Sequence, residues 1–320
     1  MSRQTVTVIG GGANCEHEVS LASAASVSAA LDPTRFVVQS LTIGRDGGWQ
    51  DAAGTSIGLS RAVAAIQHSD VVFPAVHGPG GEDGSLAALL EFANVPYVGS
   101  GVRAGALAMD KQTTKLIAQS VGVRTAPGVV VTASSDPLPT MTLPLVTKPV
   151  AAGSSYGVTL VTRAAELGAA IDAALQFDDR VLVEQCIVGR EVDIAVLGRA
   201  DGTMLVSAPL EIVVDNGVFD TELKYDGSAD FRVPADVSDR TLRDLHAQSQ
   251  TLFAALGCAG VARFDYFVTD AGLVLNEVNT MPGMTAQSQV PRMFAAVGLE
   301  YRSLLTELVD AALSTPKPRR

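Results

Sequence analysis

Cysteine is scarce in this sequence of 320 residues, and the three that occur, Cys15, Cys186 and Cys258, lie far apart without a CxxC pair. Such a sparse, odd set excludes a disulfide framework or a zinc site and predicts reduced thiols. The N-terminal segment lacks the basic stretch and long apolar stretch of a signal peptide. No segment approaches the roughly 18 consecutive apolar residues of a membrane span. We therefore expect a soluble, cytoplasmic protein.

Positive charge is also in short supply. The sequence has 23 Lys and Arg against 34 Asp and Glu, which gives a formal net charge of −11. Nucleic-acid binding depends on neutralising phosphates, and docking on anionic membranes depends on basic residues, so this balance argues against both. We expect small molecules as partners, and a local basic pocket for a phosphorylated one is compatible with the net charge.

In the N-terminal third, short apolar runs that end in glycine alternate with helical patterns. The runs cover 5–9, 37–43 and 71–76, with a short fourth at 96–98. This alternation predicts a Rossmann-like parallel α/β domain over residues 1–104. Ligands gather beyond the carboxyl ends of parallel strands, where the sequence places GGGANCEHE, HGPGGEDG and VGSG.

Beyond Lys111, strands follow one another closely with helices between them, which predicts mixed α+β structure. We expect helices at about 111–121, 164–175, 237–256 and 295–314, and strands near 129–131, 145–148, 158–161, 181–184, 261–268 and 273–278. The polar stretch 215–236 is long for a connection, and such connections are usually functional or disordered.

The clearest chemical motif combines Arg263 and Asp265 with the segment Asn276–Asn279. If the last two strands pair as a hairpin, Asp265, Glu277 and Asn279 converge, because residues two apart share one face of a strand. Their oxygens suit Mg²⁺, which fills the rest of its shell with phosphate and water. A solvated polar face of the hairpin is the alternative.

A second motif could bind phosphate. Lys148 ends an apolar run, a poor place for a charge without a partner, and the segment GSSYG (153–157) follows it. Small residues between glycines let main-chain N–H groups wrap a phosphate. An ordinary β-turn is the alternative.

Three further sites each allow two interpretations. Glu184 follows an apolar run, so it either contacts an adenine and ribose or simply ends a strand. His77 lies in a glycine-rich loop, and it either acts as a catalytic base or holds the loop by hydrogen bonds. Glu16 and Glu18 either cap a helix or bind the ammonium group of an amino acid. Cys186 and Cys258 have apolar neighbours and are expected to be core thiols.

Taken together, eight segments resemble the D-alanine–D-alanine ligase family of the ATP-grasp superfamily. They are GGGANCEHEVSL (10–21), HGPGGEDG (77–84), YVGSGVRAGALAMDK (97–111), TKPVAAGSSYG (147–157), VEQCIVGREV (183–192), ELKY (222–225), GVARFDYF (260–267) and NEVNTMPGMT (276–285). The resemblance spans roughly residues 5–312. It implies that the α/β domain is followed by a two-domain ATP-grasp fold (α+β), over 105–189 and 190–320, with ATP between two antiparallel sheets. It also implies a closing loop at 215–236 and a homodimer.

The resemblance implies a role for each matching residue in binding ATP and metal. Lys111, Lys148 and Ser155 would lie at the phosphates. The adenine would be lined by Glu184, Cys186 and Ile187, and the ribose would be bound by Glu191. Lys224 would act from the closing loop. Asp265, Glu277 and Asn279 would hold Mg²⁺. The resemblance implies two such ions, and Mn²⁺ can substitute for them. A requirement for a monovalent cation stays open.

The same resemblance implies the amino-acid site. Glu16, supported by Ser154, would bind the first ammonium, and His77 would lie near that substrate's carboxylate. Arg263 and the Gly283 N–H would form the oxyanion site, Ser288 would bind the second carboxylate, and Tyr225 would act from the closing loop. The catalytic set is then Glu16, Ser154, Tyr225 and Arg263.

The implied activity is ATP-dependent joining of two D-alanines through an acylphosphate, for peptidoglycan synthesis. Tyr225 favours an amide over an ester product. Asn14-Cys15, Tyr156 and Ala286-Gln287 depart from the family's usual residues. They leave open a different amino-acid substrate, such as D-serine, or a dipeptide ligase of secondary metabolism. A non-catalytic nucleotide-binding protein would have lost a metal ligand or a phosphate lysine, and all are present.

Overall fold

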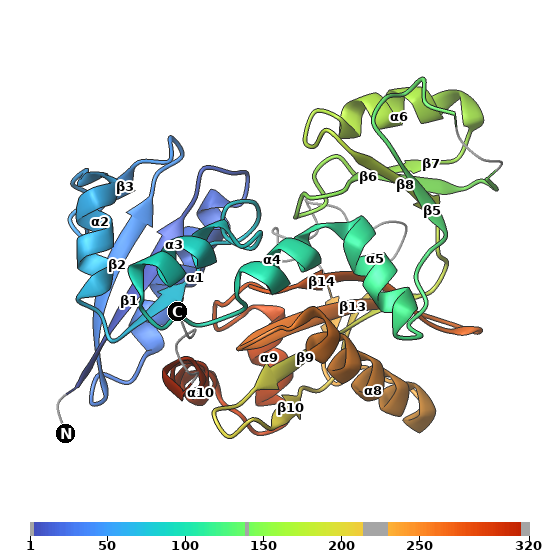
Figure 1. The fold of residues 1–320 in the computed structure, drawn as a ribbon. Helices are drawn as coiled ribbons and strands as arrows, with labels where there is room; N and C mark the ends of the chain where they lie inside the picture. Colours follow the sequence, from blue (N-terminus) through green and yellow to red (C-terminus); the bar gives the residue numbers. More distant parts are fainter. Residues whose placement is uncertain (1–2, 138–140, 214–229, 315–320) are drawn as a thin grey trace.

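The structure is a computed structural model that describes residues 3–137, 141–213 and 230–314. Its strands form three separate sheets, which lie in different parts of the molecule (Figure 1). Sheet A belongs to the N-terminal part of the chain, sheet C to the middle and sheet B to the C-terminal part. Each of the three expected domains thus contains one sheet, while the exact boundaries stay predictions.

Sheet A has the strand order β3-β2-β1-β4. The parallel strands are β1 (Gln4–Gly11), β2 (Phe36–Ile43) and β4 (Val71–Pro74), and β3 (Trp49–Gln50) is an antiparallel edge. Helices α1 (His17–Ala30), α2 (Gly58–Gln67) and α3 (Ser85–Ala93) complete this part. The expected parallel α/β fold is confirmed. The expected strand at 96–98 is a single bridge from Tyr97 to Val72, since Pro96 has no N–H to extend the pairing.

Sheet C is antiparallel throughout, with the order β5-β8-β6-β7. Its strands are β5 (Gly128–Val131), β6 (Leu145–Pro149), β7 (Thr159–Val161) and β8 (Val181–Gln185). A 3₁₀ turn, η1 (Ala164–Glu166), leads into α6 (Leu167–Ala174), which packs on this sheet. Helices α4 (Val102–Met109) and α5 (Lys111–Ser120) connect sheets A and C along the chain.

Sheet B is also antiparallel, with the order β12-β11-β9-β13-β14 and β10 beside β9. Its strands are β9 (Arg190–Gly198), β10 (Met204–Val206), β11 (Leu210–Val213), β12 (Asp230–Arg232), β13 (Val261–Thr269) and β14 (Gly272–Asn279). Helix α8 (Asp239–Leu256) packs on it, and α9 (Gln289–Ala295) and α10 (Tyr301–Ser314) end the described chain. Two antiparallel sheets after an α/β part are the expected ATP-grasp arrangement, which is therefore confirmed.

The expected terminal helix at about 295–314 is confirmed from Tyr301 onward, but its expected start is wrong, and the short helix α9 before it was not predicted. Helix α9 ends at Ala295 and α10 begins only at Tyr301. Gly298 separates them with a φ of 86°, a left-handed value that cannot continue a right-handed helix. The break lets α10 turn back toward sheet A.

The largest apolar core joins the two ends of the chain. Val27 of α1 and Phe73 of β4 belong to one buried cluster with Phe294 of α9 and Leu305 of α10. This cluster continues onto sheet B, so the N-terminal and C-terminal parts share a core, whereas sheet C and α6 have a small core of their own. Among the helices of the described residues, none is long and apolar enough to cross a membrane.

Candidate active site

A first cavity of about 520 Å³ lies between sheets C and B. Lys148 of β6 and Glu184 of β8 line one side, and Ile212 of β11 and Phe267 of β13 line the other. All predicted nucleotide ligands that the structure describes line it: Lys111, Lys148, Ser155, Glu184, Cys186, Ile187 and Glu191. Lys224 lies outside the described residues. A cavity of this size and place suits a nucleotide held between two antiparallel sheets.

Lys148 and Glu184 belong to a buried charged cluster at the back of this cavity. The Lys148 Nζ lies 2.5 Å from Glu184 Oε1 and donates a hydrogen bond of 3.1 Å to Asn276 Oδ1. Lys115 of α5 forms an ion pair with the other oxygen, Glu184 Oε2. Burial alone would raise the pKa of Glu184, but Lys148 and Lys115 lower it, so the carboxylate is charged. The sequence predicted that Lys148 needs a partner, and the structure shows that this partner is Glu184 of the same chain.

The segment that follows β6 forms an irregular loop over the cavity. Ser154 and Ser155 adopt φ values of 50° and 58°, which are uncommon for residues with a side chain. Two hydrogen bonds hold the start of the loop: the Ala151 N–H donates to Asp178 Oδ2 at 2.6 Å, and Lys111 Nζ donates to the Ala152 carbonyl at 2.6 Å. The Tyr156 N–H donates to the Gly153 carbonyl at 3.2 Å, so the segment contains the β-turn of the alternative interpretation. Because this turn also lines the cavity, the two interpretations are compatible, and phosphate binding stays a prediction.

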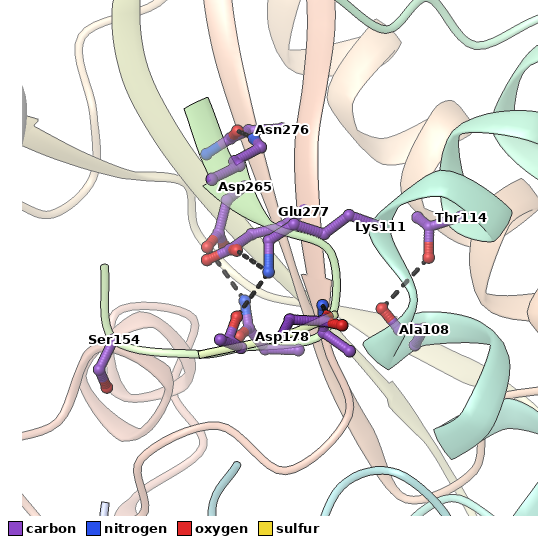
Figure 2. A network of polar contacts seen from close by, with 12 residues as sticks. Ala108, Lys111, Thr114, Ser154, Asp178, Asp265, Asn276 and Glu277 are labelled. Carbon is purple, nitrogen blue, oxygen red and sulfur yellow. Dashed lines mark hydrogen bonds and ion pairs between the residues drawn. The ribbon is translucent and has the colours of Figure 1, made fainter. Parts of the chain in front are cut away.

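The two predicted metal-binding carboxylates meet as expected. Strands β13 and β14 pair with Asp265 directly opposite Glu277, and Asn279 Nδ2 donates to Asp265 Oδ2 at 3.0 Å. Lys111 Nζ forms an ion pair with Glu277 Oε2 at 3.7 Å. Figure 2 shows the two side chains lying side by side. In the described part of the chain no three His, Cys, Asp or Glu side chains gather as a metal site. The donor set therefore consists of two carboxylates and an amide, and it fits a hard cation that completes its shell with phosphate and water.

Arg263 lies beside these carboxylates and is held on several sides. Its Nε and Nη2 donate to the two oxygens of Asp265 at 2.7 and 2.8 Å, and its Nη1 donates to Gln289 Oε1 at 2.6 Å. Asp193 Oδ2 lies 3.6 Å from its Nε. These partners raise the pKa of Arg263 although burial opposes the charge, so the guanidinium stays positive.

A second cavity, of about 670 Å³, lies between the N-terminal part, the loop 150–158 and sheet B. This loop is called the phosphate loop below, after its predicted role. The predicted amino-acid ligands that the structure describes all line it: Glu16, His77, Ser154, Arg263, Gly283 and Ser288. Tyr225 lies outside the described residues. Six residues line both cavities and form a shared wall: Lys111, Ala152, Gly153, Glu191, Ile212 and Glu277. A phosphate end in one cavity and an amino acid in the other would therefore meet at this wall.

Glu16 is one of the buried carboxyl side chains that line the second cavity. It precedes α1 but makes no side-chain cap bond, whereas Glu18 forms an exposed ion pair with Arg45. Ser154 Oγ donates to Glu16 Oε1, and among the described residues no group donates a hydrogen bond to Oε2. A buried carboxylate oxygen without a donor costs free energy, so the site favours a cationic ligand over a cap.

His77 is almost fully buried, and both of its ring nitrogens are engaged. Nδ1 lies 2.7 Å from the Met281 carbonyl, and Nε2 lies 2.7 Å from Ser23 Oγ. Burial lowers the pKa of His77, so the ring is neutral. The geometry favours the interpretation that His77 holds a loop, while its predicted proximity to a substrate carboxylate stays a prediction.

Sequence reasoning missed three residues that line the second cavity, Glu82, Asp193 and Gln289. It also missed Ser23 and Lys115, which line neither cavity but bond to His77 and Glu184. Lys115 follows Lys111 by one helical turn, and this spacing is the only local signal that could have indicated it. The expectation that Cys186 is a core thiol is wrong, because it is partly exposed and lines the first cavity. Cys258 does pack against the core of sheet B.

Comparisons with known proteins agree with this geometry. Family models match twice: "D-ala D-ala ligase C-terminus" over residues 123–310 and "D-ala D-ala ligase N-terminus" over 5–65 and 50–100. The D-alanine–D-alanine ligase of Mycolicibacterium smegmatis is 38% identical over 361 residues, covering 98% of this chain and 96% of that protein.

Solved structures give the same result. The VanG D-Ala:D-Ser ligase from Enterococcus faecalis superposes with a TM-score of 0.84 at 31% identity, covering 97% of this chain and 100% of that one. The D-alanine–D-alanine ligase from Bacillus anthracis complexed with ATP superposes with a TM-score of 0.81 at 25% identity, covering 97% of each chain. The chain therefore belongs to the D-alanine–D-alanine ligase family.

Proposed function

We propose that this chain joins two D-alanines to D-alanyl-D-alanine at the expense of ATP, through an acylphosphate, and that the product serves peptidoglycan synthesis. The observation that carries the proposal is the shared wall of the two cavities. Glu277 and Lys111 belong to both, so a nucleotide phosphate in the first would face an amino-acid carboxylate in the second. Family membership supports the choice of substrates.

In the first step the carboxylate of one D-alanine attacks the γ-phosphorus of ATP and ADP leaves. Glu16 binds the ammonium of this D-alanine through the oxygen that Ser154 leaves available. Lys111 and Lys148 neutralise phosphate charge. Asp265, Glu277 and Asn279 would hold Mg²⁺, which supplies further charge neutralisation on the phosphoryl oxygens when bound.

In the second step the neutral amine of the other D-alanine attacks the acyl carbon. The C–N bond forms and the C–O bond to phosphate breaks. The proton that the amine loses ends on the departing phosphate, which leaves as HPO4²⁻. Arg263 and the Gly283 N–H stabilise the negative oxygen that develops on the carbon, and Ser288 binds the carboxylate of the second substrate. Arg263 is suited to this role because its charge is fixed in place by Asp265 and Gln289.

We infer that Lys224 and Tyr225, on the segment 215–236, complete the site when nucleotide is bound. An acylphosphate is hydrolysed by water, so a closing segment preserves the intermediate for the amine. A cytoplasmic location fits the three free thiols, and the homodimer that the resemblance implies stays a prediction.

Phosphate release with Mg²⁺ and ATP, measured with and without D-alanine and with the product identified by mass, tests this function. We expect D-alanine-dependent release and D-alanyl-D-alanine. If phosphate is released only when a different amino acid is supplied as the second substrate, that amino acid would replace the second D-alanine in the proposal. D-serine is the first to try, because the similar VanG protein is a D-Ala:D-Ser ligase. No turnover with any amino acid would contradict the ligase function.

A further inference from the structure

Three main-chain groups of the loop 280–285 are bonded by side chains of the N-terminal part. The Met281 N–H donates to Glu82 Oε2 at 3.1 Å, and the Met281 carbonyl lies 2.7 Å from His77 Nδ1. The Met284 N–H donates to Ser23 Oγ at 3.2 Å. These bonds lie on both sides of Gly283 in the sequence. The loop is thus held from a different part of the chain, at distances of 199 to 261 residues along it.

The hydrogen bonds form one consistent chain of donors and acceptors. In the neutral His77 ring, Nδ1–H must donate to the Met281 carbonyl, so Nε2 accepts from the Ser23 hydroxyl. The same Ser23 oxygen accepts the Met284 N–H. Glu82 accepts the Gly78 N–H with its other oxygen, at 2.9 Å, which fixes the side chain between two loops. Each group therefore has a defined partner, and the tautomer follows from these partners.

Gly283 has no side chain by which its own position could be fixed, and Pro282 before it has no N–H to donate. Hydrogen bonds that orient these two residues must therefore act through the main chain beside them, as the bonds at Met281 and Met284 do. The buried side chains of Met281 and Met284, and the bond from the Tyr301 hydroxyl to the Met284 carbonyl, hold the loop in addition. An oxyanion donor works only when it points at the place where charge develops, and a displacement of about 1 Å can cost roughly 10²-fold in rate.

We propose that Ser23, His77 and Glu82 form a clamp that aims the Gly283 N–H at the reacting carbon. The clamp comprises the bonds from these three side chains to Met281 and Met284. His77 is then a positioning residue that acts through Met281. The inference rests on the proposed function, because that function assigns Gly283 to the oxyanion site.

The variant Ser23→Ala tests the clamp. It removes one hydroxyl and no charge, and Ser23 is fully buried and outside the lining of both cavities. If the Gly283 N–H no longer points at the reacting carbon, the attack of the second amine slows, and water hydrolyses the acylphosphate instead. We expect dipeptide formation to fall about tenfold to a hundredfold, the ratio of phosphate released to dipeptide formed to rise above one, and the KM for ATP to stay unchanged.

Ser249→Ala is the matched control, since Ser249 is equally buried but its hydroxyl bonds Tyr266 within the C-terminal part. We expect its phosphate-to-dipeptide ratio to stay at one. Glu82→Gln is a second test, which weakens the bond to the Met281 N–H and should raise the ratio as well. Hydrogen exchange of the peptide that contains Met281–Met284 should become faster in both clamp variants and not in the control.

A folded Ser23→Ala protein with unchanged ratio and dipeptide rate would overturn the clamp while leaving the ligase function intact. A wild-type protein that forms no dipeptide would contradict the proposed function and the clamp's role with it. The two failures are therefore distinguished by the wild-type measurement alone.

Discussion

Asp265 and Glu277 lie directly opposite each other on β13 and β14. Like charges in this position destabilise an antiparallel pair, and Arg263 and Lys111 only partly surround them with positive charge. A bound divalent cation would relieve this repulsion. The pair is therefore the part of the site whose stability should respond most to metal.

We expect Mg²⁺ to raise the thermal midpoint of the ADP-bound protein, since a ligand at 100 times its Kd stabilises by about 2.7 kcal/mol. Glu277→Gln should abolish this increment and lower turnover by orders of magnitude. Thermal unfolding and phosphate release check both effects. Glu307→Gln, at an ion pair with Arg199 away from the cavities, is the control. Normal turnover in a folded Glu277→Gln protein would remove the metal assignment.

Lys115 should matter for ATP although it does not line the cavity. With Lys148 and Glu184 it forms a buried cluster of net charge +1, and Lys115→Met would reduce that charge to zero beside the phosphates. We expect the KM for ATP to rise about tenfold or more, which corresponds to about 1.4 kcal/mol, with partial rescue in Lys115→Arg. Arg240→Met removes an exposed charge on α8 and should have no effect. An unchanged KM in Lys115→Met would contradict the charge argument.

The aromatic contact between Tyr156 and Phe177 should hold the phosphate loop. Their ring centroids lie 6.0 Å apart, and such pairs contribute about 0.5–1.5 kcal/mol. Phe177→Ala should therefore raise the KM for ATP several-fold and leave the KM for D-alanine nearly unchanged. Phe92→Ala, at an exposed phenylalanine on α3, is the matched control. Equal effects of the two variants would show that the contact does not support the loop.

Glu82 should make the stability of the free protein depend on pH. Burial and the negative charge of Glu16 raise its pKa from 4.5 to about 8, while Arg263 opposes the shift. Between these values the folded protein holds a proton that the unfolded chain has lost. The free energy of unfolding therefore decreases as pH rises through this window.

We expect Glu82→Gln to lose this dependence between pH 7 and 8, at a slope of at most about 1.4 kcal/mol per pH unit. The neighbouring His77 has a lowered pKa, so its contribution to the free energy of unfolding increases with pH only up to about pH 6.5. It therefore does not affect the comparison between pH 7 and 8. Urea unfolding of both proteins at pH 7 and 8 measures the difference. Parallel pH profiles would show that Glu82 is ionised throughout.

Periodicity and motif spacing predicted the parts of this fold that local sequence controls. The hairpin that brings Asp265 to Glu277 follows from two apolar runs and a short turn, and the glycine-ended strands predicted sheet A. The clamp could not be predicted in this way, because Ser23 and Met284 lie 261 residues apart. Lys115 likewise meets Glu184 across 69 residues. The break at Gly298 was missed because the apolar periodicity continues on both sides of it.

The described residues that line the first cavity all come from positions 111–277, whereas the second cavity also takes residues from the N-terminal part, such as Glu16 and His77. Substitutions before residue 105 can therefore alter the selectivity for the amino acid without changing any described residue that lines the proposed ATP cavity. Amino-acid selectivity and ATP binding can thus evolve as separate traits. Among the described residues, the exceptions are those of the shared wall, such as Lys111 and Glu277, where one substitution would affect both.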